Sequence, residues 1–564
     1  MNTQTRRRIV LGGAAVTVAG VIGYAMAQPT SAVTSSGHHH GQTSGPAHQQ
    51  HVMAAFTANG LDPSYEEAQR VPDGPVMRGE GVRPFVGVPA SGDPVKGSFS
   101  PVVDWPIIGI HAVVLPDGRV FSYGSNAQGA QTGQYIYDVW DPKKGTGADA
   151  HQVLPNRTSV DIFCSAQLLR PDGKVEIYGG DVDVDGVTTN KPNADITTFQ
   201  PSTNTLTRTG EMQRKRWYAS ATTLHNGQAY VQGGSGGADH PEVREASGGT
   251  RLLTGVDTSQ LASGYPRNFV RTDGTIFGIS AKAMYSVNTA GVGSLTTKGT
   301  FPATNTGGTS SAVMYEPNKI LQVGGGVVSG QAGSKEARVV DISAAAPVIS
   351  SVPSMASGRH WSNATVLADG RVFVDGGSSK ANAVDPALPN GGVAYTSELF
   401  NPKAKTWASG PTAKRMRLYH GTSTLLRDGS VLTMGGGAPG PQRNLNAEIY
   451  YPPYLFTATG QRAARPKITY LKPRLAPASA FSVASDQARS IRKIALVKTG
   501  STTHSFNLDQ RRLELSFSMR PGERRMMQAQ LPSAGYTPPG YYMVFLIDDK
   551  GVPSEAGIVN IAAH

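Results

Sequence analysis

The residues best suited to chemistry in this chain lie at seven positions that recur at intervals of 44 to 59 residues. These positions carry Gly109, Cys164, Tyr218, Tyr265, Thr309, Trp361 and His420. Cys164 is the single cysteine of the 564 residues, and Tyr419 directly precedes His420. Packing alone would favour small or aliphatic side chains, so a thiol, phenols, an indole and an imidazole indicate a redox or metal site. A plug of aromatic rings, each with its polar tip hydrogen-bonded, is the alternative interpretation.

Imidazole and phenolate groups form a mixed nitrogen and oxygen donor set. Copper(II) in tetragonal geometry suits such a set, whereas zinc favours sulfur and calcium favours carboxylate oxygen. A free tyrosine has a pKa of about 10, so it becomes a phenolate ligand only when a metal or a base takes its proton. The residue types therefore predict a copper ion.

A repeated phrase defines the seven positions. An apolar run is followed by an Asp-Gly turn and a second apolar run that ends in Gly-Gly, as in NATVLADGRVFVDGGS. Each position lies nine residues before the turn residue of its copy, namely Gly118, Gly173, Gly227, Gly274, Asn318, Gly370 and Gly429. The phrase resembles kelch repeats, whose four-stranded units pack radially. We predict an all-β fold with a seven-bladed kelch-type β-propeller over residues 101–464, in which the seven positions face the central channel.

After residue 465 the repeated phrase no longer occurs, and the sequence predicts a run of alternating strands that ends at Ile561. This pattern predicts a C-terminal immunoglobulin-like β-sandwich over residues 465–564. His504 lies in this second domain, within Thr503-His504-Ser505. For His504 to join the other candidate ligands, its hairpin must extend along the propeller axis, and the two domains would then form one functional unit.

Residues 1–27 have the three regions of a cleavable export signal. Arg6-Arg7-Arg8 precedes a Gly/Ala-rich apolar run, and Ala25-Met26-Ala27 offers a cleavage site. Paired arginines favour the twin-arginine route, which carries folded proteins. We therefore expect an extracytoplasmic protein, in the periplasm, in the cell envelope or secreted; an uncleaved signal anchor is the alternative.

Residues 28–100 predict a flexible leader, because they are rich in Gly, Ser, Pro and Gln. Five of the 13 histidines fall in this segment, at His38, His39, His40, His48 and His51. A low-complexity tract without supporting partners is expected to bind metal weakly and to play no catalytic part.

The composition excludes several classes of protein. With 67 glycines and 38 prolines, the chain disfavours a helical bundle. The formal charge is +12, yet the densest basic cluster lacks the interleaved aromatic residues of a nucleic-acid surface; it comprises Arg511, Arg512, Arg520, Arg524 and Arg525. We expect no nucleic-acid partner, and attraction to an acidic envelope polymer is the alternative to a solvated face.

The motifs around the candidate ligands carry a specific resemblance. They are Phe163-Cys164-Ser165, Arg216-Trp217-Tyr218, Leu418-Tyr419-His420-Gly421 and Thr503-His504-Ser505, supported by Tyr451-Pro452-Pro453-Tyr454-Leu455 and Pro538-Pro539-Gly540-Tyr541-Tyr542-Met543. From about residue 100 to its end, the chain resembles the galactose oxidase and glyoxal oxidase family of copper radical oxidases. It is identified as a bacterial glyoxal-oxidase-like member.

The resemblance implies that Tyr218, Tyr419, His420 and His504 bind one copper ion, and that a thioether joins Cys164 to Tyr218 as a protein-derived radical cofactor. This agrees with electron counting. Oxidation of an alcohol removes two electrons, whereas copper cycling between its two common states accepts one, so a second redox group is needed. The resemblance further implies that Tyr419 is the axial ligand and takes the substrate hydroxyl proton, and that dioxygen reoxidises the site and yields hydrogen peroxide.

The chain departs from galactose oxidase at the tryptophan that shields the radical, since the equivalent stretch reads Gly233-Gly234-Ser235-Gly236-Gly237-Ala238. Trp361 is the preferred substitute because it shares the repeat register, and Trp217 is the alternative because it adjoins Tyr218. No carbohydrate-binding module is expected before the propeller. Small aldehydes, as their hydrates, or small primary alcohols are therefore the expected substrates.

Other residues have weaker predicted roles. Tyr265 and Arg267, and less so His360 and Arg359, are candidates for the substrate entrance. His111, His151 and His225 fall outside the repeat register and are expected to be structural.

Two further function classes stay open. One is a non-catalytic kelch propeller that serves as a binding or scaffold protein of the cell envelope, and the other is a carbohydrate-binding envelope protein with vestigial metal affinity. For the oxidase, the expected partners are dioxygen and the small substrate, with an envelope polysaccharide and a copper donor protein as further possibilities. A monomer is expected.

Overall fold

The computed structural model describes residues 74–80, 87–184, 187–301, 307–326, 332–380, 392–437 and 442–563. The predicted export signal and the histidines between residues 38 and 51 lie outside these ranges. No helix within the described residues is long and apolar enough to cross a membrane.

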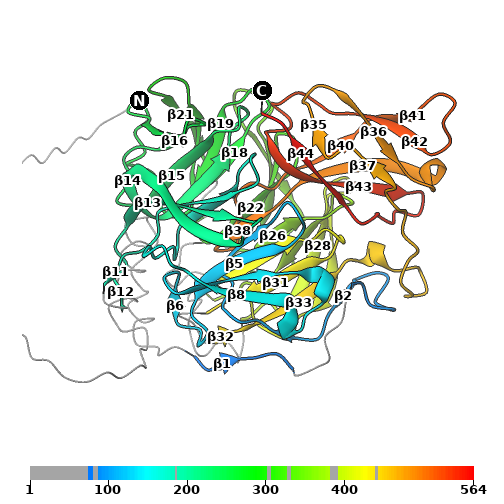
Figure 1. Ribbon diagram of the computed structural model, residues 1–564, viewed down its shortest axis with the longest axis horizontal. Coiled ribbons are helices and arrows are strands. Elements are labelled where there is room, and N and C mark those ends of the chain that lie inside the picture. Colours follow the sequence, from blue (N-terminus) through cyan, green and yellow to red (C-terminus); the bar gives the residue numbers. More distant parts are fainter. Residues whose placement is uncertain are drawn as a thin grey trace, which may run out of the picture. The chain divides into compact units, whose positions relative to one another are not determined.

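Seven four-stranded antiparallel sheets succeed one another along the chain, which confirms the predicted propeller (Figure 1). The first sheet contains β4 (His111–Val114), β5 (Val120–Ser125), β7 (Ile136–Trp140) and β8 (His151–Pro155), and the second contains β9 (Ala166–Leu169), β10 (Val175–Tyr178), β13 (Asn193–Gln200) and the first part of β14 (Thr205–Thr223). The third sheet contains the second part of β14 with β15 (Ala229–Ser235), β16 (Glu242–Arg244) and β17 (Thr250–Leu252). The fourth contains β18 (Arg267–Val270), β19 (Ile276–Ser280), β20 (Ala283–Asn288) and β21 (Ser294–Thr300).

The remaining three sheets are built in the same way. They contain β22 (Ser311–Glu316), β23 (Lys319–Val323), β24 (Ala337–Asp341) and β25 (Val348–Val352); β26 (Asn363–Val366), β27 (Val372–Asp375), β28 (Thr396–Asn401) and β29 (Thr406–Thr412); and β30 (Gly421–Leu425), β31 (Val431–Gly435) and β33 (Asn446–Tyr451) with β2 (Ser98–Phe99) and β3 (Val103–Asp104). We number these sheets as blades 1 to 7. Each repeated phrase of the sequence forms the first two strands of a blade.

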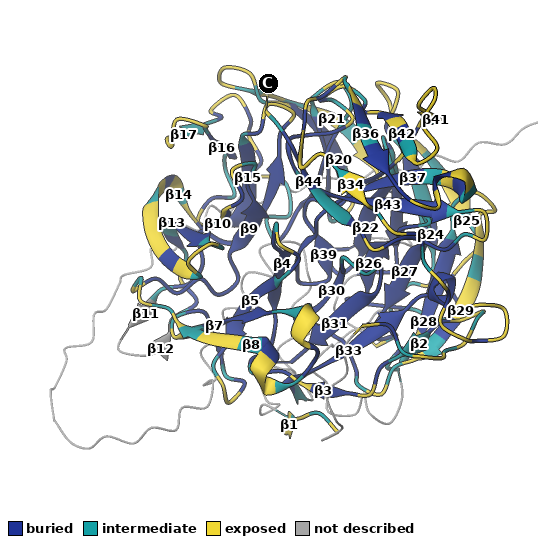
Figure 2. Cartoon of the chain, turned by 45° about the vertical axis from the view of Figure 1, so that its right-hand side comes forward, coloured by how far each residue is buried: buried dark blue, intermediate teal, exposed yellow. Residues whose placement is uncertain are grey.

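Burial follows strand order within a blade. The first strands β4, β9, β22, β26 and β30 are almost wholly buried, whereas β8 at the outer edge of blade 1 is largely exposed (Figure 2). β14 is unusually long because its first part pairs with β13 in blade 2 and its second part pairs with β15 in blade 3. One strand thus joins two consecutive blades.

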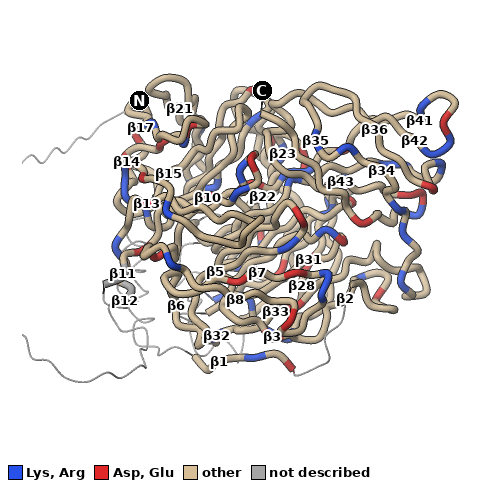
Figure 3. The backbone as a smooth tube through the Cα atoms, in the orientation of Figure 1, with Lys and Arg blue, Asp and Glu red and all other residues tan. Residues whose placement is uncertain are grey.

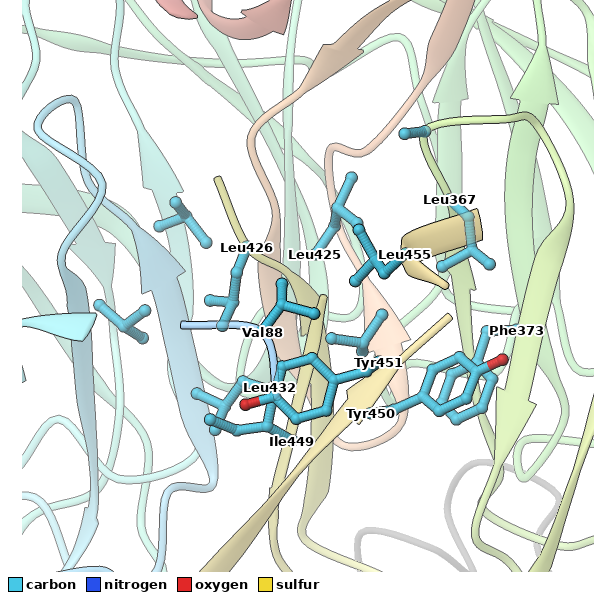
Figure 4. Close-up of a cluster of buried hydrophobic side chains, with 14 of the residues drawn as sticks. Val88, Leu367, Phe373, Leu425, Leu426, Leu432, Ile449, Tyr450, Tyr451 and Leu455 are labelled. Atoms are coloured by element: carbon cyan, nitrogen blue, oxygen red, sulfur yellow. The ribbon is translucent and has the colours of Figure 1, made fainter. Parts of the chain in front are cut away.

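The ring of blades is closed by residues that precede blade 1. β2 and β3 pair antiparallel with β33 and supply the outer edge of blade 7. Phe99 packs against Tyr450 with ring centroids 5.6 Å apart, and Tyr450 stacks on Phe373 at 4.0 Å. Val88 lies in the same buried cluster (Figure 4). Closure of this kind joins the two ends of the propeller through a sheet.

The predicted leader is therefore too long at its C-terminal end. Residues 98–99 already form a blade strand, although the sequence predicts flexible leader up to residue 100. A two-residue strand has no periodicity of its own, and its pairing with a strand some 350 residues away leaves no local signal.

The second domain is a β-sandwich, as predicted. One sheet contains β34 (Tyr470–Leu471), β36 (Ala480–Ala484), β42 (Met526–Gln530) and β41 (Phe517–Met519), and the other contains β35 (Arg474–Leu475), β44 (Gly557–Ile561), β43 (Gly540–Asp548), β37 (Ile491–Lys498) and β40 (Arg512–Leu515). Alternate residues of both sheets, including Phe481, Ile494, Leu496 and Val544, form its buried core. The core explains the alternating pattern of the sequence.

Short elements complete the described chain. They are β1 (Val76–Met77), which pairs with β32 (Arg443–Asn444); β6 (Gln131–Thr132); β11 (Asp183–Val184) and β12 (Val187–Thr188); and the 3-10 helices η2 (Pro142–Lys144), η3 (Ala148–Ala150), η5 (Pro453–Leu455) and η6 (Ala488–Ser490).

Residues 499–511 leave the sandwich between β37 and β40 and enter the propeller channel; we call this segment the plug. It contains β38 (Ser501–Thr503) and β39 (Phe506–Asn507), and β38 pairs with the first strand β4 of blade 1. In Figure 1, β38 lies among the strands of the propeller rather than with those of the sandwich. The predicted extension of the His504 hairpin into the channel is therefore present.

Hydrogen bonds connect the plug to every blade. In order from blade 1 to blade 7, they join Thr502 to Ala112, Thr502 to Gln167, Asp509 to Thr223, Arg511 to Val270, Ser505 to Ser311, Gln510 to Val366 and Ser505 to Gly421. A segment attached on all sides has little freedom to rotate or slide. It can place His504 reproducibly.

The basic cluster predicted to be a solvated face is divided in the structure. Arg511 and Arg512 are buried and donate to the carbonyls of Val270 and Ala368. Arg520, Arg524 and Arg525 are exposed around the β41–β42 hairpin. Figure 3 shows basic and acidic residues interspersed along the described chain. The prediction of a solvated face is thus wrong for Arg511 in the plug and Arg512 at the start of β40, because both side chains donate to backbone carbonyls of the propeller.

The buried ion pair of the plug gives a test of its contribution to stability. Lys498 and Asp509 lie 2.6 Å apart with side chains 2% and 6% exposed, and Asp509 also accepts from Thr223. Replacing Asp509 with Ala leaves the Lys498 ammonium buried without its carboxylate, so we expect a loss of about 3–5 kcal/mol in the free energy of unfolding. Urea denaturation measures it.

The matched control is Asp549→Ala, because Asp549 pairs with Arg492 at 3.7 Å in an exposed position. We expect that change to cost less than about 1 kcal/mol. Equal effects of the two substitutions would contradict the structural role assigned to the plug.

Candidate metal centre

The predicted ring residues share an unusual backbone conformation. Cys164, Tyr218, Tyr265, Trp361 and His420 have φ values of 54°, 71°, 44°, 59° and 69°, in the left-handed region that residues with a Cβ rarely adopt. His504, which enters from the plug, has a φ of 46°. Such strain persists only where the surrounding structure enforces it, and it is common at functional sites.

Backbone hydrogen bonds link ring residues of consecutive blades. The Tyr218 amide donates to the Cys164 carbonyl at 2.8 Å, and the Tyr265 amide donates to the Tyr218 carbonyl at 2.8 Å. Farther round the ring, the Trp361 amide donates to the Thr309 carbonyl at 3.0 Å. These bonds hold equivalent residues side by side, as the repeat register predicts.

Buried ion pairs support three of the ring loops. Arg216, Arg359 and Arg417 precede the ring residues of blades 3, 6 and 7, and they pair with Glu242, Glu398 and Glu448 at 2.9, 2.9 and 3.3 Å. Each arginine also donates to backbone carbonyls. These ion pairs were not predicted, although an arginine two or three residues before three of the ring residues was a visible signal.

Two histidines approach each other at the centre, with ring centroids 4.7 Å apart. His420 Nδ1 lies 2.9 Å from the Gly437 carbonyl, which can only accept, so Nδ1 carries the proton and Nε2 has its lone pair available. His504 Nδ1 lies 2.6 Å from the Thr503 hydroxyl, and its Nε2 lies 3.4 Å from Cys164 Sγ. Ligand atoms of Cys164, His420 and His504 all lie within 4.8 Å of one another.

Two tyrosine hydroxyls meet at the same place. The Tyr218 and Tyr419 hydroxyls are in direct hydrogen-bond contact, and the Tyr419 ring lies 3.9 Å from the His420 ring. Burial raises the pKa of Tyr218 well above its usual range, and it lowers the pKa of His504 well below its ordinary value. The imidazole is therefore neutral, as a ligand must be, and a phenol here becomes phenolate only when a cation displaces its proton.

The sulfur of Cys164 adjoins the Tyr218 phenol. Cys164 is fully buried, and burial raises the pKa of its thiol although the Tyr218 and Tyr265 hydroxyls hydrogen-bond to it. The thiol and the Tyr218 phenol are therefore in contact at the centre.

The donor set of two imidazoles and two phenols fits copper(II), which accepts mixed nitrogen and oxygen ligands. Tyr218, Tyr419, His420 and His504, all at most 2% exposed, come from two blades and the plug. The sequence named these four residues and Cys164, and the structure brings all five together.

The two candidate tryptophans lie on different tyrosines. Trp361 meets Tyr419 with ring centroids 5.0 Å apart and planes at 60°, and Trp217 meets Tyr218 at 4.4 Å and 86°. Both indoles are buried. Each therefore borders the centre, and the choice of Trp361 as the residue that shields the Cys164–Tyr218 pair stays a prediction.

The predicted entrance residues are mostly structural. Arg267 is 3% exposed and donates to the carbonyls of Tyr265, Gly308 and Ser310, while Arg359 is fully buried in its ion pair. The prediction that these arginines line the substrate entrance is wrong, because their guanidinium groups join backbone segments instead. His360 Nδ1 lies 2.7 Å from the Thr309 hydroxyl, inside the protein.

Tyr265 belongs to the centre itself. Its ring stacks on His504 at 4.4 Å, and it meets Tyr218 at 5.0 Å. Tyr265 therefore packs against His504 on one side and against Tyr218, the candidate for the radical, on the other.

His111 lies closer to the centre than the sequence suggests. Its ring centroid is 5.7 Å from that of His504, it stacks on Tyr123 at 4.3 Å, and its Nδ1 bonds Gln167 at 2.9 Å. Burial lowers the pKa of His111 to about 3, so the ring is neutral and serves as a wall. His151 bonds Asp138 in blade 1, and His225 is exposed at a turn.

Comparison with known proteins agrees with this geometry. The galactose oxidase-like early set domain matches residues 465–561. This range covers the β-sandwich. Across most of the chain, a galactose oxidase of Gibberella zeae is 28% identical over 507 residues, covering 83% of this chain and 71% of the relative. An aldehyde oxidase of Vitis pseudoreticulata is 24% identical over 523 residues, covering 81% and 95%.

The fold has a counterpart among solved structures. A fungal alcohol oxidase of the AA5 family, solved in complex with copper, superimposes with a TM-score of 0.75 at 23% identity, covering 83% of this chain and 99% of that chain. Over most of its length the chain is therefore similar to galactose oxidase and to aldehyde oxidases, and its second domain matches the galactose oxidase-like early set model.

The Thr503 hydroxyl gives a test of ligand positioning. Replacing Thr503 with Val removes the partner of His504 Nδ1, so the imidazole loses its fixed orientation. We expect copper affinity to fall by about 10- to 100-fold, measured by competition with a chelator. The control is Thr502→Val. Thr502 lies in the same hairpin as Thr503, but its hydroxyl donates to the Ala112 carbonyl at 3.4 Å and does not touch the imidazole. Equal affinities of the two variants would refute the positioning role.

Proposed function

We propose that the protein is a secreted, mononuclear copper radical oxidase that oxidises small aldehydes, as their hydrates, or primary alcohols and reduces dioxygen to hydrogen peroxide. The observation that carries the proposal is the convergence of two imidazoles, two phenols and the single thiol at one buried point. The similarity of the chain to galactose oxidase and to aldehyde oxidases supports the reaction type.

In this proposal Tyr218, Tyr419, His420 and His504 hold one copper ion. Copper supplies a Lewis acid for the substrate oxygen and a one-electron redox partner. The Gly437 carbonyl and the Thr503 hydroxyl bond the Nδ1 atoms of His420 and His504, so each imidazole would bind the metal through Nε2. Aromatic rings around the centre exclude water, which strengthens electrostatic interactions inside it.

The Cys164–Tyr218 pair would accept the second electron that the substrate releases. Formation of the thioether joins sulfur to a ring carbon and removes one thiol and one ring hydrogen, so two electrons and two protons pass to dioxygen as hydrogen peroxide. The sulfur then donates electron density into the ring and favours a phenoxyl radical. Burial of both side chains protects that radical from solvent.

Tyr419 takes the proton of the substrate hydroxyl. Its hydroxyl contacts that of Tyr218, so a substrate oxygen that approaches one of these residues also lies near the other. As a phenolate, Tyr419 would accept the hydroxyl proton, and as a phenoxyl radical, Tyr218 would accept a hydrogen atom from the adjacent carbon. Overall, the alcohol and dioxygen give the aldehyde and hydrogen peroxide, and an aldehyde hydrate gives the carboxylic acid.

The remaining parts of the proposal rest on the sequence. Arg6-Arg7-Arg8 and Ala25-Met26-Ala27 support export by the twin-arginine route. We extend the proposal to a bacterial glyoxal-oxidase-like enzyme that acts outside the membrane as a monomer, receives copper from a donor protein and modifies an envelope polysaccharide through its peroxide.

The cross-link can be tested by mass. We expect the intact protein to become two hydrogen atoms lighter after aerobic copper loading, with a linked peptide that contains Cys164 and Tyr218. Cys164→Ser removes the sulfur, so its mass stays unchanged and its peroxide production falls to background. A free Cys164 thiol in copper-loaded protein would contradict the radical mechanism.

The role of Tyr419 can be tested by kinetics. Tyr419→Phe removes the proton acceptor, and we expect kcat/KM per bound copper to fall by about 100-fold or more in oxygen uptake with glycolaldehyde. The control is Tyr450→Phe, whose hydroxyl bonds the Lys96 carbonyl at the closure of the ring. Activity of the Tyr419 variant equal to that of the control would exclude the assigned role.

A further inference from the structure

A cavity lies where the outer strands of blades 1 and 7 meet, away from the channel. Its volume is about 590 Å³, within the range of small-molecule sites. The residues that line it come from β3, η3, β8 and the segments beside them, and the argument uses Arg78, Asp104, Trp105, Thr146, His151 and Val153. None of these residues belongs to the metal centre.

Three lining residues carry buried polar atoms that have no hydrogen-bond partner among the described residues. These atoms are Trp105 Nε1, Thr146 Oγ1 and His151 Nε2. Trp105 is 1% exposed, Thr146 is 7% exposed, and the His151 side chain is 6% exposed. Buried polar groups are nearly always satisfied, so three orphans around one cavity indicate an occupant that supplies their partners.

The cavity holds its histidine in a fixed orientation. His151 Nδ1 lies 2.8 Å from Asp138 Oδ2, and Asp138 is fully buried. The Trp105 ring meets the His151 ring edge to face at 4.5 Å. These contacts fix the imidazole so that Nε2 stays available to an occupant.

The charges around the cavity disfavour an anion. Arg78 brings one positive charge, whereas Asp104 lines the cavity and Asp138 lies behind His151. The apolar part of the cavity wall is formed by Val102, Val103, Pro106, Ala148 and Val153. A neutral ligand that both donates and accepts hydrogen bonds, and that has an apolar face, fits this lining. Sugars have these properties.

We propose that this cavity is a non-catalytic binding site for a neutral saccharide unit. The hydroxyl groups of the sugar accept from Trp105 Nε1 and exchange hydrogen bonds with Thr146 and His151, and its C–H face packs on the apolar wall. The site goes beyond the proposed oxidase function and does not depend on it, since its residues lie at the outer edges of blades 1 and 7 and none is a residue of the metal centre. A saccharide bound there would hold the protein on a glycan.

The test uses calorimetric titration of the copper-loaded full chain without oxygen, so that turnover cannot occur. The probes are galactose, glucose, N-acetylglucosamine and their β-1,4-linked disaccharides. We expect at least one probe to bind with a Kd of about 1 mM or tighter. Thr146→Val, which removes only the hydroxyl, and His151→Gln are each expected to weaken that binding by about 10-fold.

The control is His225→Gln, which changes an exposed histidine of a distant turn and is expected to leave binding unchanged. Oxygen uptake should be equal in all variants, which separates failure of this site from failure of the oxidase. The proposal is overturned if no probe binds, if Thr146→Val and His151→Gln both bind like the control, or if gluconate binds in place of every neutral sugar.

Discussion

The plug is the constraint on which the metal centre depends. Residues 499–511 belong to the sandwich by chain order, yet their hydrogen bonds reach all seven blades, and the Lys498–Asp509 ion pair anchors them where they enter the channel. His504 stands at the tip of this segment with a strained backbone. A ligand carried by a free hairpin would lose positional entropy on binding metal, whereas the plug has its geometry fixed on folding. The two domains therefore act as one unit, because each supplies candidate ligands to the same metal centre.

The propeller supplies the other half of the same arrangement. A repeat that places equivalent residues around one axis gives each blade a single position at the channel, and backbone bonds such as Tyr218 to Cys164 hold neighbouring positions together. The left-handed φ of five of these residues costs free energy that packing and the buried Arg–Glu pairs offset. A site assembled in this way is rigid, and rigidity suits a centre that must bring two phenols, two imidazoles and a sulfur into contact without a flexible loop.

Sequence reasoning recovered the parts of the structure that repeat. The Asp-Gly register placed Cys164, Tyr218, Tyr265, Trp361 and His420 on one ring, and the positive φ values show why that register is structural. It failed where contacts are unique and distant. The pairing of Ser98–Phe99 with blade 7, the burial of Arg511 and Arg512 and the carbonyl contacts of Arg267 depend on segments far apart in the chain, which have no local pattern. His111 lies two residues after the ring position Gly109, so the register could have indicated its nearness to His504.

The most direct test of this account is a crystal structure of the copper-loaded full chain, with anomalous scattering recorded at the copper absorption edge. The account predicts one strong peak inside the channel, bound by Tyr218, Tyr419, His420 and His504, with the last ligand delivered by the plug. Copper held instead among the histidines between residues 38 and 51, or a channel peak that lacks His504, would contradict it.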